Sequence, residues 1–219
     1  GYFSVPYIVR TGAAVLHACE WNADALEALR NNFRLNGGRV RGADGAAAAR
    51  GATGRDGGGA PRRFDLYDST MDWRSAAAAA GLGGRGAKVV VVHGGDNRVT
   101  APTALAGIAD RVNLGLLPSS EGGWPVAVAV LKASGGTLHV HGNVFTGDWV
   151  AREEGDPRSN RDRDKVAGQK WGRHVAGQIE RLGEAAGKPW AVRCVHVEFV
   201  KSYSPRVTHF VADVVCCAR

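Results

Sequence analysis

Residues 113–124 have the sequence NLGLLPSSEGGW, and this stretch decides the fold. The apolar run 112–117 is short and is interrupted only by Asn113 and a glycine, as expected for a strand buried on both faces of a parallel sheet. Pro118 ends this strand, and an apolar stretch of helical length follows at 124–131. The loop between them therefore lies at the carboxyl end of a strand, which is the edge where open α/β sheets bind ligands.

An earlier strand also ends at a residue suited to a ligand. Residues 13–19 are predicted to form this strand, and Asn22 is placed to cap a helix over 23–36. Glu20 lies at the end of the strand, about twenty residues after a glycine turn, where nucleotide-binding α/β folds hold a ribose hydroxyl pair. A solvated strand end would use the same residue type, so the spacing alone leaves both interpretations open.

The clearest strand is predicted at 88–93, KVVVVH, because β-branched residues favour strands. It leads into Gly94, Gly95, Asp96 and Asn97. Glycines let the backbone approach a ligand closely, and the Asp-Asn pair supplies the acceptor and the donor that an adenine edge requires. A turn without a ligand would use the same residues, so this assignment also stays open.

The carboxyl-terminal part of the chain predicts an antiparallel hairpin. Residues 190–200 and 207–217 alternate like two strands, and the short connection at 201–205 makes them antiparallel neighbours. A parallel α/β sheet that ends in such a hairpin is the layout of the S-adenosylmethionine-dependent transferases, as opposed to the hydride-transfer folds.

The sequence gives little support for a metal site. His139 and His141 alternate onto one face of a predicted strand at 137–144 and could form a pair of ligands, but no third ligand follows at a sensible spacing, so a structural role is favoured. The four cysteines have no CxxC spacing, which disfavours zinc binding and a disulfide framework. We expect no metal and a reducing compartment, the cytoplasm.

Length and composition predict one domain over 1–219. The net charge of +7 is typical of proteins that bind nucleic acid. Much of this charge lies in 37–63, which consists almost entirely of Gly, Ala and Arg and cannot bury enough apolar surface to order itself. We therefore predict a disordered insertion at 37–86. An RNA-contacting arm is the alternative interpretation of this segment.

No apolar run approaches the ~20 residues that span a bilayer, and no signal peptide opens the chain, so we expect a soluble protein without a membrane partner. The chain begins without Met in the middle of a glycine motif. This start predicts a fragment whose first strand is missing.

Three motifs together resemble the tRNA wybutosine-synthesising aminocarboxypropyl transferases: CEWN at 19–22, GDNR at 95–98 and DRVNLGLLPSS at 110–120. GKPW at 187–190 and VKSYSP at 200–205 extend the likeness to the carboxyl end. The family is similar in fold to the methyltransferases that modify the guanosine beside the anticodon. The resemblance implies an α/β, Rossmann-like class I S-adenosylmethionine-dependent transferase, present as a fragment of its catalytic domain.

The resemblance also assigns roles to residues. It implies that Glu20 holds the ribose of S-adenosylmethionine, that Asp96 and Asn97 hold the adenine, and that the loop from Asn113 lies between cofactor and target base. The remaining members of the cofactor set are the adjacent Trp21 and the vestige of the glycine turn, Gly1, Tyr2 and Phe3. The implied catalytic residues are Asn113, Pro118 and Ser119, with Asn113 orienting the base by hydrogen bonds.

The implied reaction depends on which electrophilic carbon of the sulfonium faces the nucleophile. By resemblance, the γ-carbon of the methionine moiety is presented, so a 3-amino-3-carboxypropyl group is transferred to a ring carbon of 4-demethylwyosine and 5′-methylthioadenosine is left. The implied partner is phenylalanine tRNA, at its anticodon loop, and we expect a monomer. Two alternatives stay open: a tRNA guanine-N1 methyltransferase, and a non-catalytic RNA-binding remnant.

Overall fold

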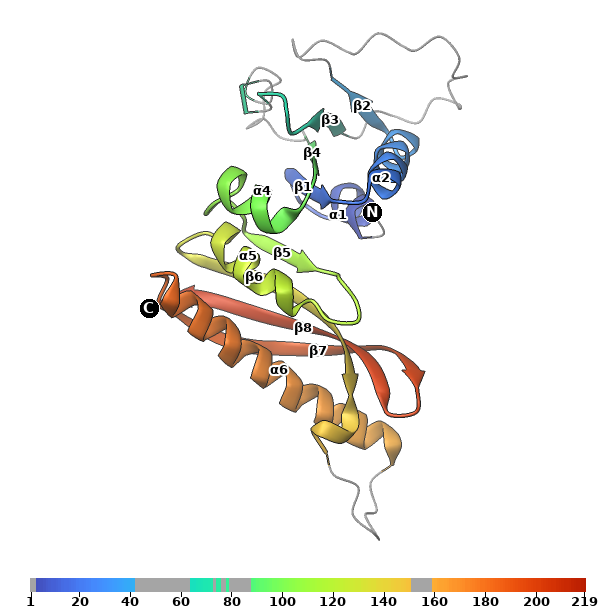
Figure 1. Ribbon diagram of the computed structural model, residues 1–219, viewed down its shortest axis with the longest axis vertical. Helices are drawn as coiled ribbons and strands as arrows, with labels where there is room; N and C mark the ends of the chain where they lie inside the picture. Colours follow the sequence, from blue (N-terminus) through green and yellow to red (C-terminus); the bar gives the residue numbers. More distant parts are fainter. Residues whose placement is uncertain (1–2, 42–63, 73, 76–77, 79–87, 151–158) are drawn as a thin grey trace. The chain divides into compact units, whose positions relative to one another are not determined.

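The structure is a computed structural model that describes residues 3–41, 64–72, 74–75, 78, 88–150 and 159–219. The chain divides into two compact units, Gly1–Thr100 and Ala101–Arg219, and each is described by itself. Each unit contains a four-stranded sheet together with helices (Figure 1). The single domain over 1–219 stays a prediction, because the division into two compact units does not test it.

The first unit is a parallel α/β layer. Its strands follow the order β1-β4-β3-β2, and all three pairings are parallel. The elements are α1 (Ser4–Arg10), β1 (Val15–Glu20), α2 (Ala23–Leu35), β2 (Gly38–Val40), β3 (Phe64–Asp68) and β4 (Val89–Gly94). The next helix, α4 (Asn97–Ala104), begins in the first unit and ends in the second.

The helices α1 and α2 cover one face of the first sheet. Ile8 of α1 and Leu29 and Phe33 of α2 are buried in one cluster with Val90 and Val92 of β4. The cap of α2 is the predicted one, because the Asn22 side chain accepts a hydrogen bond from the backbone N–H of Ala25 at 3.0 Å. The strand predicted at 88–93 and the helix predicted at 23–36 are thereby confirmed.

The predicted insertion at 37–86 was wrong in two places. β2 and β3 lie inside this range, and Phe64, Leu66 and Tyr67 of β3 are buried. The Gly-, Ala- and Arg-rich stretch ends at residue 63, and the five residues of β3 that follow it place their large side chains in the core. The rest of the predicted insertion, including 42–63 and 79–87, lies outside the described residues.

The second unit contains a mixed sheet in the order β5-β6-β8-β7, with β5 parallel to β6 and the other two pairings antiparallel (Figure 1). This arrangement confirms the predicted carboxyl-terminal hairpin. The elements are β5 (Arg111–Leu114), η1 (Glu121–Gly123), α5 (Trp124–Val130), β6 (Gly135–Phe145), η2 (Thr146–Asp148), α6 (Asn160–Ala185), β7 (Trp190–Ser204) and β8 (Val207–Ala218).

The two faces of the second sheet differ in chemistry. Leu138 and Val140 of β6 and Val214 of β8 belong to one apolar cluster with side chains of α5 and α6. Side chains alternate along a strand, so the residues between these core positions lie on the other face. That face carries the polar residues His139, His141, Asn143, His209 and Asp213. None of the described helices is both long and apolar enough to cross a membrane.

Candidate functional site

The carboxyl edge of the first sheet brings the predicted cofactor residues together. Glu20, the last residue of β1, is in register with Gly94 of β4, and the backbone N–H of Gly95 donates to the Glu20 carbonyl at 3.0 Å. Gly95 has a φ of 107°, which a residue with a side chain rarely adopts. Glu20 and the turn containing Asp96 are therefore neighbours at one edge of the sheet.

The Glu20 carboxylate is held by the backbone at the start of α2. Its Oε1 accepts a hydrogen bond from the backbone N–H of Asn22 at 2.9 Å, which orients the group at the start of α2. A carboxylate offers about four acceptor sites, so this bond leaves capacity for two ribose hydroxyls. Trp21 beside it is 77% exposed.

Asp96 is already engaged by a neighbouring cation. Its Oδ2 accepts from Nη2 of Arg98 at 2.6 Å, and its Oδ1 accepts from the Arg98 backbone N–H at 2.9 Å. Hydrogen bonds from the Arg98 side chain and backbone hold the pKa of Asp96 below its ordinary value. Asn97 begins α4 and is exposed. An adenine bound by Asp96 would have to share this carboxylate with Arg98.

The predicted cofactor residues at the start of the chain are described only in part. Gly1 and Tyr2 lie outside the described residues. Phe3 is half-buried at the N-cap of α1, and its carbonyl accepts the N–H of Tyr7 at 3.1 Å.

A histidine pair that the sequence analysis missed lies within the first unit. Nδ1 of His17 on β1 is 2.9 Å from Nε2 of His93 on β4. Burial, and then the neighbouring His93 and Arg74, lower the pKa of His17 to about 4. Burial also lowers the pKa of His93, although Asp68 opposes this. Both rings are therefore neutral at physiological pH.

In the second unit, the strand before the predicted loop is shorter and less buried than expected. β5 ends at Leu114 and not at residue 117, and it lies at one end of the sheet order. Its residues are half-buried or exposed, so the predicted burial on both faces was wrong. Gly115 and Leu116 after it are exposed, because the chain leaves the sheet there toward the loop.

The loop is tied to β6 by its backbone and by one serine. The Pro118 carbonyl, which follows a cis Leu117–Pro118 peptide bond, accepts the N–H of Asn143 at 2.8 Å. Ser119 forms a bridge with Gly142 and is exposed. The buried Ser120 hydroxyl donates to the carbonyl of His141 at 2.7 Å. The three loop residues therefore meet one short segment of β6.

Asn113 reaches the same segment through its side chain. Its Oδ1 is 3.2 Å from Nε2 of His141, and Nδ1 of His141 is 3.1 Å from Nε2 of His209 on β8. Burial, and then the neighbouring His209 and His139, lower the pKa of His141 to about 4. The predicted residues Asn113, Pro118 and Ser119 are thus gathered at 141–143 of β6.

The sequence analysis missed the roles of Ser120, His141 and His209. His139 and His141 have different partners, because Nδ1 of His139 is 2.7 Å from Oδ1 of Asp213 while His141 contacts Asn113 and His209. Among the described residues, no group of three or more His, Cys, Asp or Glu side chains could hold a metal ion. Ser120 is the last residue of the motif at 110–120, so the sequence did carry a signal for its role in the loop.

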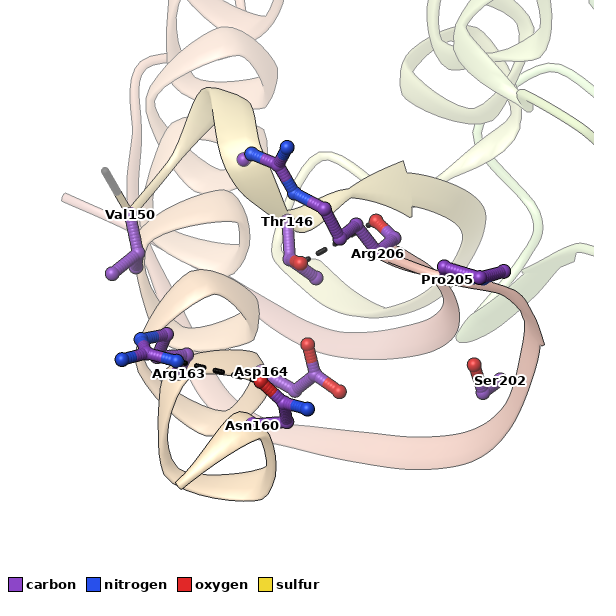
Figure 2. A pocket seen from close by; sticks show the side chains of 9 residues that line it. Thr146, Val150, Asn160, Arg163, Asp164, Ser202, Pro205 and Arg206 are labelled. Atoms are coloured by element: carbon purple, nitrogen blue, oxygen red, sulfur yellow. Dashed lines mark hydrogen bonds between the residues drawn. The ribbon is translucent and has the colours of Figure 1, made fainter. Parts of the chain in front are cut away.

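A pocket of about 180 Å³ lies where the chain leaves β6 (Figure 2). Thr146 and Gly147 line it directly after β6, and Arg206 reaches it from the β7–β8 turn. The Arg206 guanidinium lies over the Phe145 ring, 4.6 Å from the ring centroid. The backbone carbonyl of Arg206 accepts a hydrogen bond from the N–H of Thr146 at 2.7 Å. The other lining residues are Val150, Asn160, Arg163, Asp164, Ser202 and Pro205.

This pocket lies on the ligand edge of the second sheet. β5 and β6 are parallel, so the carboxyl end of β6 is at the same edge as the loop after β5. Arg163 of α6, whose guanidinium is 3.4 Å from Oδ1 of Asn160, lines the pocket, as do Asp164 and Arg206 (Figure 2). The two arginines bring positive charge to a pocket that also holds the carboxylate of Asp164.

The chain is similar in sequence to proteins named for wybutosine synthesis. No protein-family model matches the chain. A tRNA wybutosine-synthesizing protein 2/3/4 of Arabidopsis thaliana is 35% identical over 216 residues, covering 99% of this chain and 15% of the relative. A tRNA wybutosine-synthesizing protein 2 homolog of Homo sapiens is 33% identical over 248 residues, covering 99% of this chain and 44% of the relative. The chain thus spans less than half the length of either curated relative.

Solved structures are similar in fold. The structure of M. jannaschii TYW2 in complex with AdoMet has a TM-score of 0.53 at 18% identity, covering 100% of this chain and 65% of that one. Trm1 from Pyrococcus horikoshii with S-adenosyl-L-methionine has a TM-score of 0.59 at 16% identity, covering 100% of this chain and 48% of that one. The fold is accordingly the class I S-adenosylmethionine-dependent transferase fold that the sequence predicts. Along nearly its whole length, the chain is a homologue of one part of the tRNA wybutosine-synthesizing protein 2 proteins.

Proposed function

We propose that this chain is the catalytic part of a tRNA aminocarboxypropyltransferase of wybutosine biosynthesis. It transfers the 3-amino-3-carboxypropyl group of S-adenosylmethionine to 4-demethylwyosine in phenylalanine tRNA. The observation that carries the proposal is the alignment of 99% of the chain with relatives named for wybutosine synthesis, at 33–35% identity. The cytoplasm and a monomeric state stay predictions from the sequence.

The first unit fits the co-substrate. Glu20 would accept hydrogen bonds from the ribose hydroxyls, and the Gly94–Gly95 turn lets the backbone approach the ligand. Asp96 and Asn97 would bind the adenine edge, with Asp96 shared with Arg98. Trp21 and Phe3 would contribute apolar surface beside them, and the predicted contacts of Gly1 and Tyr2 stay predictions.

The chemistry requires positioning more than activation. S-adenosylmethionine supplies a sulfonium whose attached carbons are electrophilic and whose leaving group is neutral. In the proposed transfer, a bond forms between the γ-carbon and a ring carbon of the base, and the bond from the γ-carbon to sulfur breaks. The electron pair stays on sulfur, which gives 5′-methylthioadenosine, and the ring carbon loses its proton to solvent. Residues of the second unit orient the base, and Asn113 does so through its side-chain amide.

The tRNA backbone is proposed to bind at the basic pocket of the second unit. Arg163 and Arg206 line it at the ligand edge of the sheet, and arginine matches the geometry of phosphate oxygens. Phosphates of the anticodon loop are the proposed ligands. Such contacts give affinity without reading base sequence, so the choice of base falls to the loop 113–120.

The experiment that tests the proposal follows two labels from S-adenosylmethionine into tRNA. The natural protein that carries this chain is incubated with precursor tRNA and cofactor labelled either at the carboxyl carbon or at the methyl carbon. We expect the carboxyl label to enter the tRNA and the methyl label to stay out. Entry of the methyl label alone would identify a tRNA methyltransferase, and entry of neither label, with tRNA still bound, would identify a non-catalytic RNA-binding protein.

A further inference from the structure

We infer that His141 is a positioning residue, which donates its Nε2–H to Oδ1 of Asn113 and thereby turns the amide NH2 of Asn113 toward the acceptor base. This inference rests on the proposed function for the identity of the base. The contact itself is observed at 3.2 Å, between residues that are 28 positions apart in the sequence.

The direction of the hydrogen bonds follows from the atoms that meet. A side-chain amide oxygen only accepts, so Nε2 of His141 must carry the proton in its contact with Asn113. A neutral His141 then has Nδ1 as an acceptor, and Nε2 of His209 must donate to it across 3.1 Å. The three side chains form one chain of donors that runs from His209 through His141 to Asn113.

Burial supports a neutral His141. His141 is 4% exposed, and burial with a neighbouring histidine lowers its pKa to about 4. His209 is 6% exposed, and burial, and then Lys201, lower its pKa as well. Among the described residues, the groups that face His141 include His209 and Asp213 of β8, His139 of its own strand and Asn113 of β5.

The backbone around His141 is held from two sides. Its carbonyl accepts from the Ser120 hydroxyl at 2.7 Å, and the next residue, Gly142, forms a bridge with Ser119. A Cβ at Gly142 would lie 2.8 Å from Cζ2 of Trp171, so the strand packs directly against α6 there. The backbone that carries the His141 ring is therefore fixed. The same contacts set the register of the loop with Ser119 and Ser120 against β6.

The consequence for the reaction is a fixed donor. With Oδ1 of Asn113 accepting from His141, the NH2 group lies on the other side of the amide carbon. An amide NH2 can donate to a carbonyl oxygen or an unprotonated ring nitrogen of a guanine-derived base. If His141 did not set this orientation, the amide could flip and present its oxygen, which would repel those acceptor atoms.

A first measurement tests the orientation without any reaction. Two-bond ¹H–¹⁵N spectra of the chain labelled with ¹⁵N-histidine distinguish the two neutral tautomers. We expect His141 and His209 both to carry the proton on Nε2. A proton on Nδ1 of His141 would reverse the chain of donors and would overturn the inference, whether or not the protein is active.

A second measurement compares variants in the natural protein that carries this chain. His141→Leu removes the donor, His141→Gln keeps an N–H near the Nε2 position, and His139→Gln is the matched control on the same strand face, paired with Asp213. We expect kcat to fall about 100-fold in His141→Leu, as a 1 Å misplacement can cause, with cofactor affinity unchanged by calorimetry. His141→Gln should recover most of this loss, and His139→Gln should keep kcat within about twofold.

The outcomes separate the two proposals. An active wild-type protein whose His141→Leu variant keeps its kcat would overturn the positioning role and leave the proposed function standing. A wild-type protein that transfers no group, but has both protons on Nε2, would overturn the proposed function and retain the orientation of Asn113. If His141→Leu does not fold, the His141→Gln variant and the tautomer spectra still decide, because an inactive but folded His141→Gln would contradict the expected rescue.

Discussion

His141 and His209 face each other across β6 and β8, with their ring centroids 5.3 Å apart and their planes inclined by 41°. Two imidazoles at this distance cannot both be protonated without mutual repulsion. The pair therefore makes the second unit sensitive to acid, in the same pH range in which free histidine titrates.

The first prediction follows from this sensitivity. The pKa of His141 is about 4 in the folded chain and about 6.5 when unfolded. Between these values the unfolded state binds more protons, so stability is complete above about pH 6.5 and falls as the pH drops toward 4. The lowered pKa values of His17, His93 and His209 act in the same direction.

Thermal unfolding measured from pH 7 to pH 4 checks this prediction. We expect the melting temperature of the wild-type chain to fall across this range, and His141→Gln to fall less steeply because glutamine does not titrate. His196→Gln is the control, since His196 is exposed and its partner is Glu198 on the same strand. Equal slopes for the wild-type chain and His141→Gln would contradict the assignment.

A second prediction concerns the ribose contact of Glu20. Glu20→Ala should weaken S-adenosylmethionine binding by about 1–3 kcal/mol, because two hydroxyls lose a charged acceptor. Glu27→Ala is the matched control, since Glu27 is an exposed carboxylate on α2. Calorimetry on both variants measures the difference, and equal affinities would return Glu20 to the role of a solvated strand end.

A third prediction concerns Arg41 and Asp65, whose side chains are 14% and 5% exposed and 3.0 Å apart. Arg41→Leu removes a cation from a buried carboxylate, which costs about 3–5 kcal/mol in the free energy of unfolding. Arg39→Leu, at an exposed position on β2, should cost much less. Urea denaturation measures both, and two equally small losses would support the disordered insertion that the composition predicted.

A fourth prediction concerns tRNA. Arg163→Gln and Arg206→Gln should each weaken tRNA binding at low salt and reduce the slope of log affinity against log salt concentration by about 1, as loss of one phosphate contact does. Arg181→Gln removes the same charge from the other end of α6 and is the control. Unchanged affinity and slope in the two pocket variants would place the RNA elsewhere.

The sequence predicted the elements whose signals are local. Four consecutive valines defined β4, the Asn22 side chain defined the start of α2, and a short connection joined the two strands of the hairpin. That Glu20 and Asp96 lie at one sheet edge follows from the parallel pairing of β1 and β4, whose carboxyl ends meet there.

The sequence missed features that depend on contacts between distant segments. β3 begins directly after the Gly-, Ala- and Arg-rich stretch 37–63, and the predicted insertion was extended past that stretch although FDLYD at 64–68 contains none of these three residues and carries large apolar side chains. The contact of Asn113 with His141 depends on the register of β5 against β6, and that of His141 with His209 on the register of β6 against β8. Periodicity gives the face on which each residue lies but not its partner across the sheet.

The identity of the released nucleoside tests the central claim most directly. The natural protein that carries this chain is incubated with S-adenosylmethionine and precursor tRNA, and the small molecules are analysed by mass spectrometry. Transfer from the γ-carbon predicts 5′-methylthioadenosine in an amount equal to the modified tRNA. S-adenosylhomocysteine in that amount, without 5′-methylthioadenosine, would contradict aminocarboxypropyl transfer.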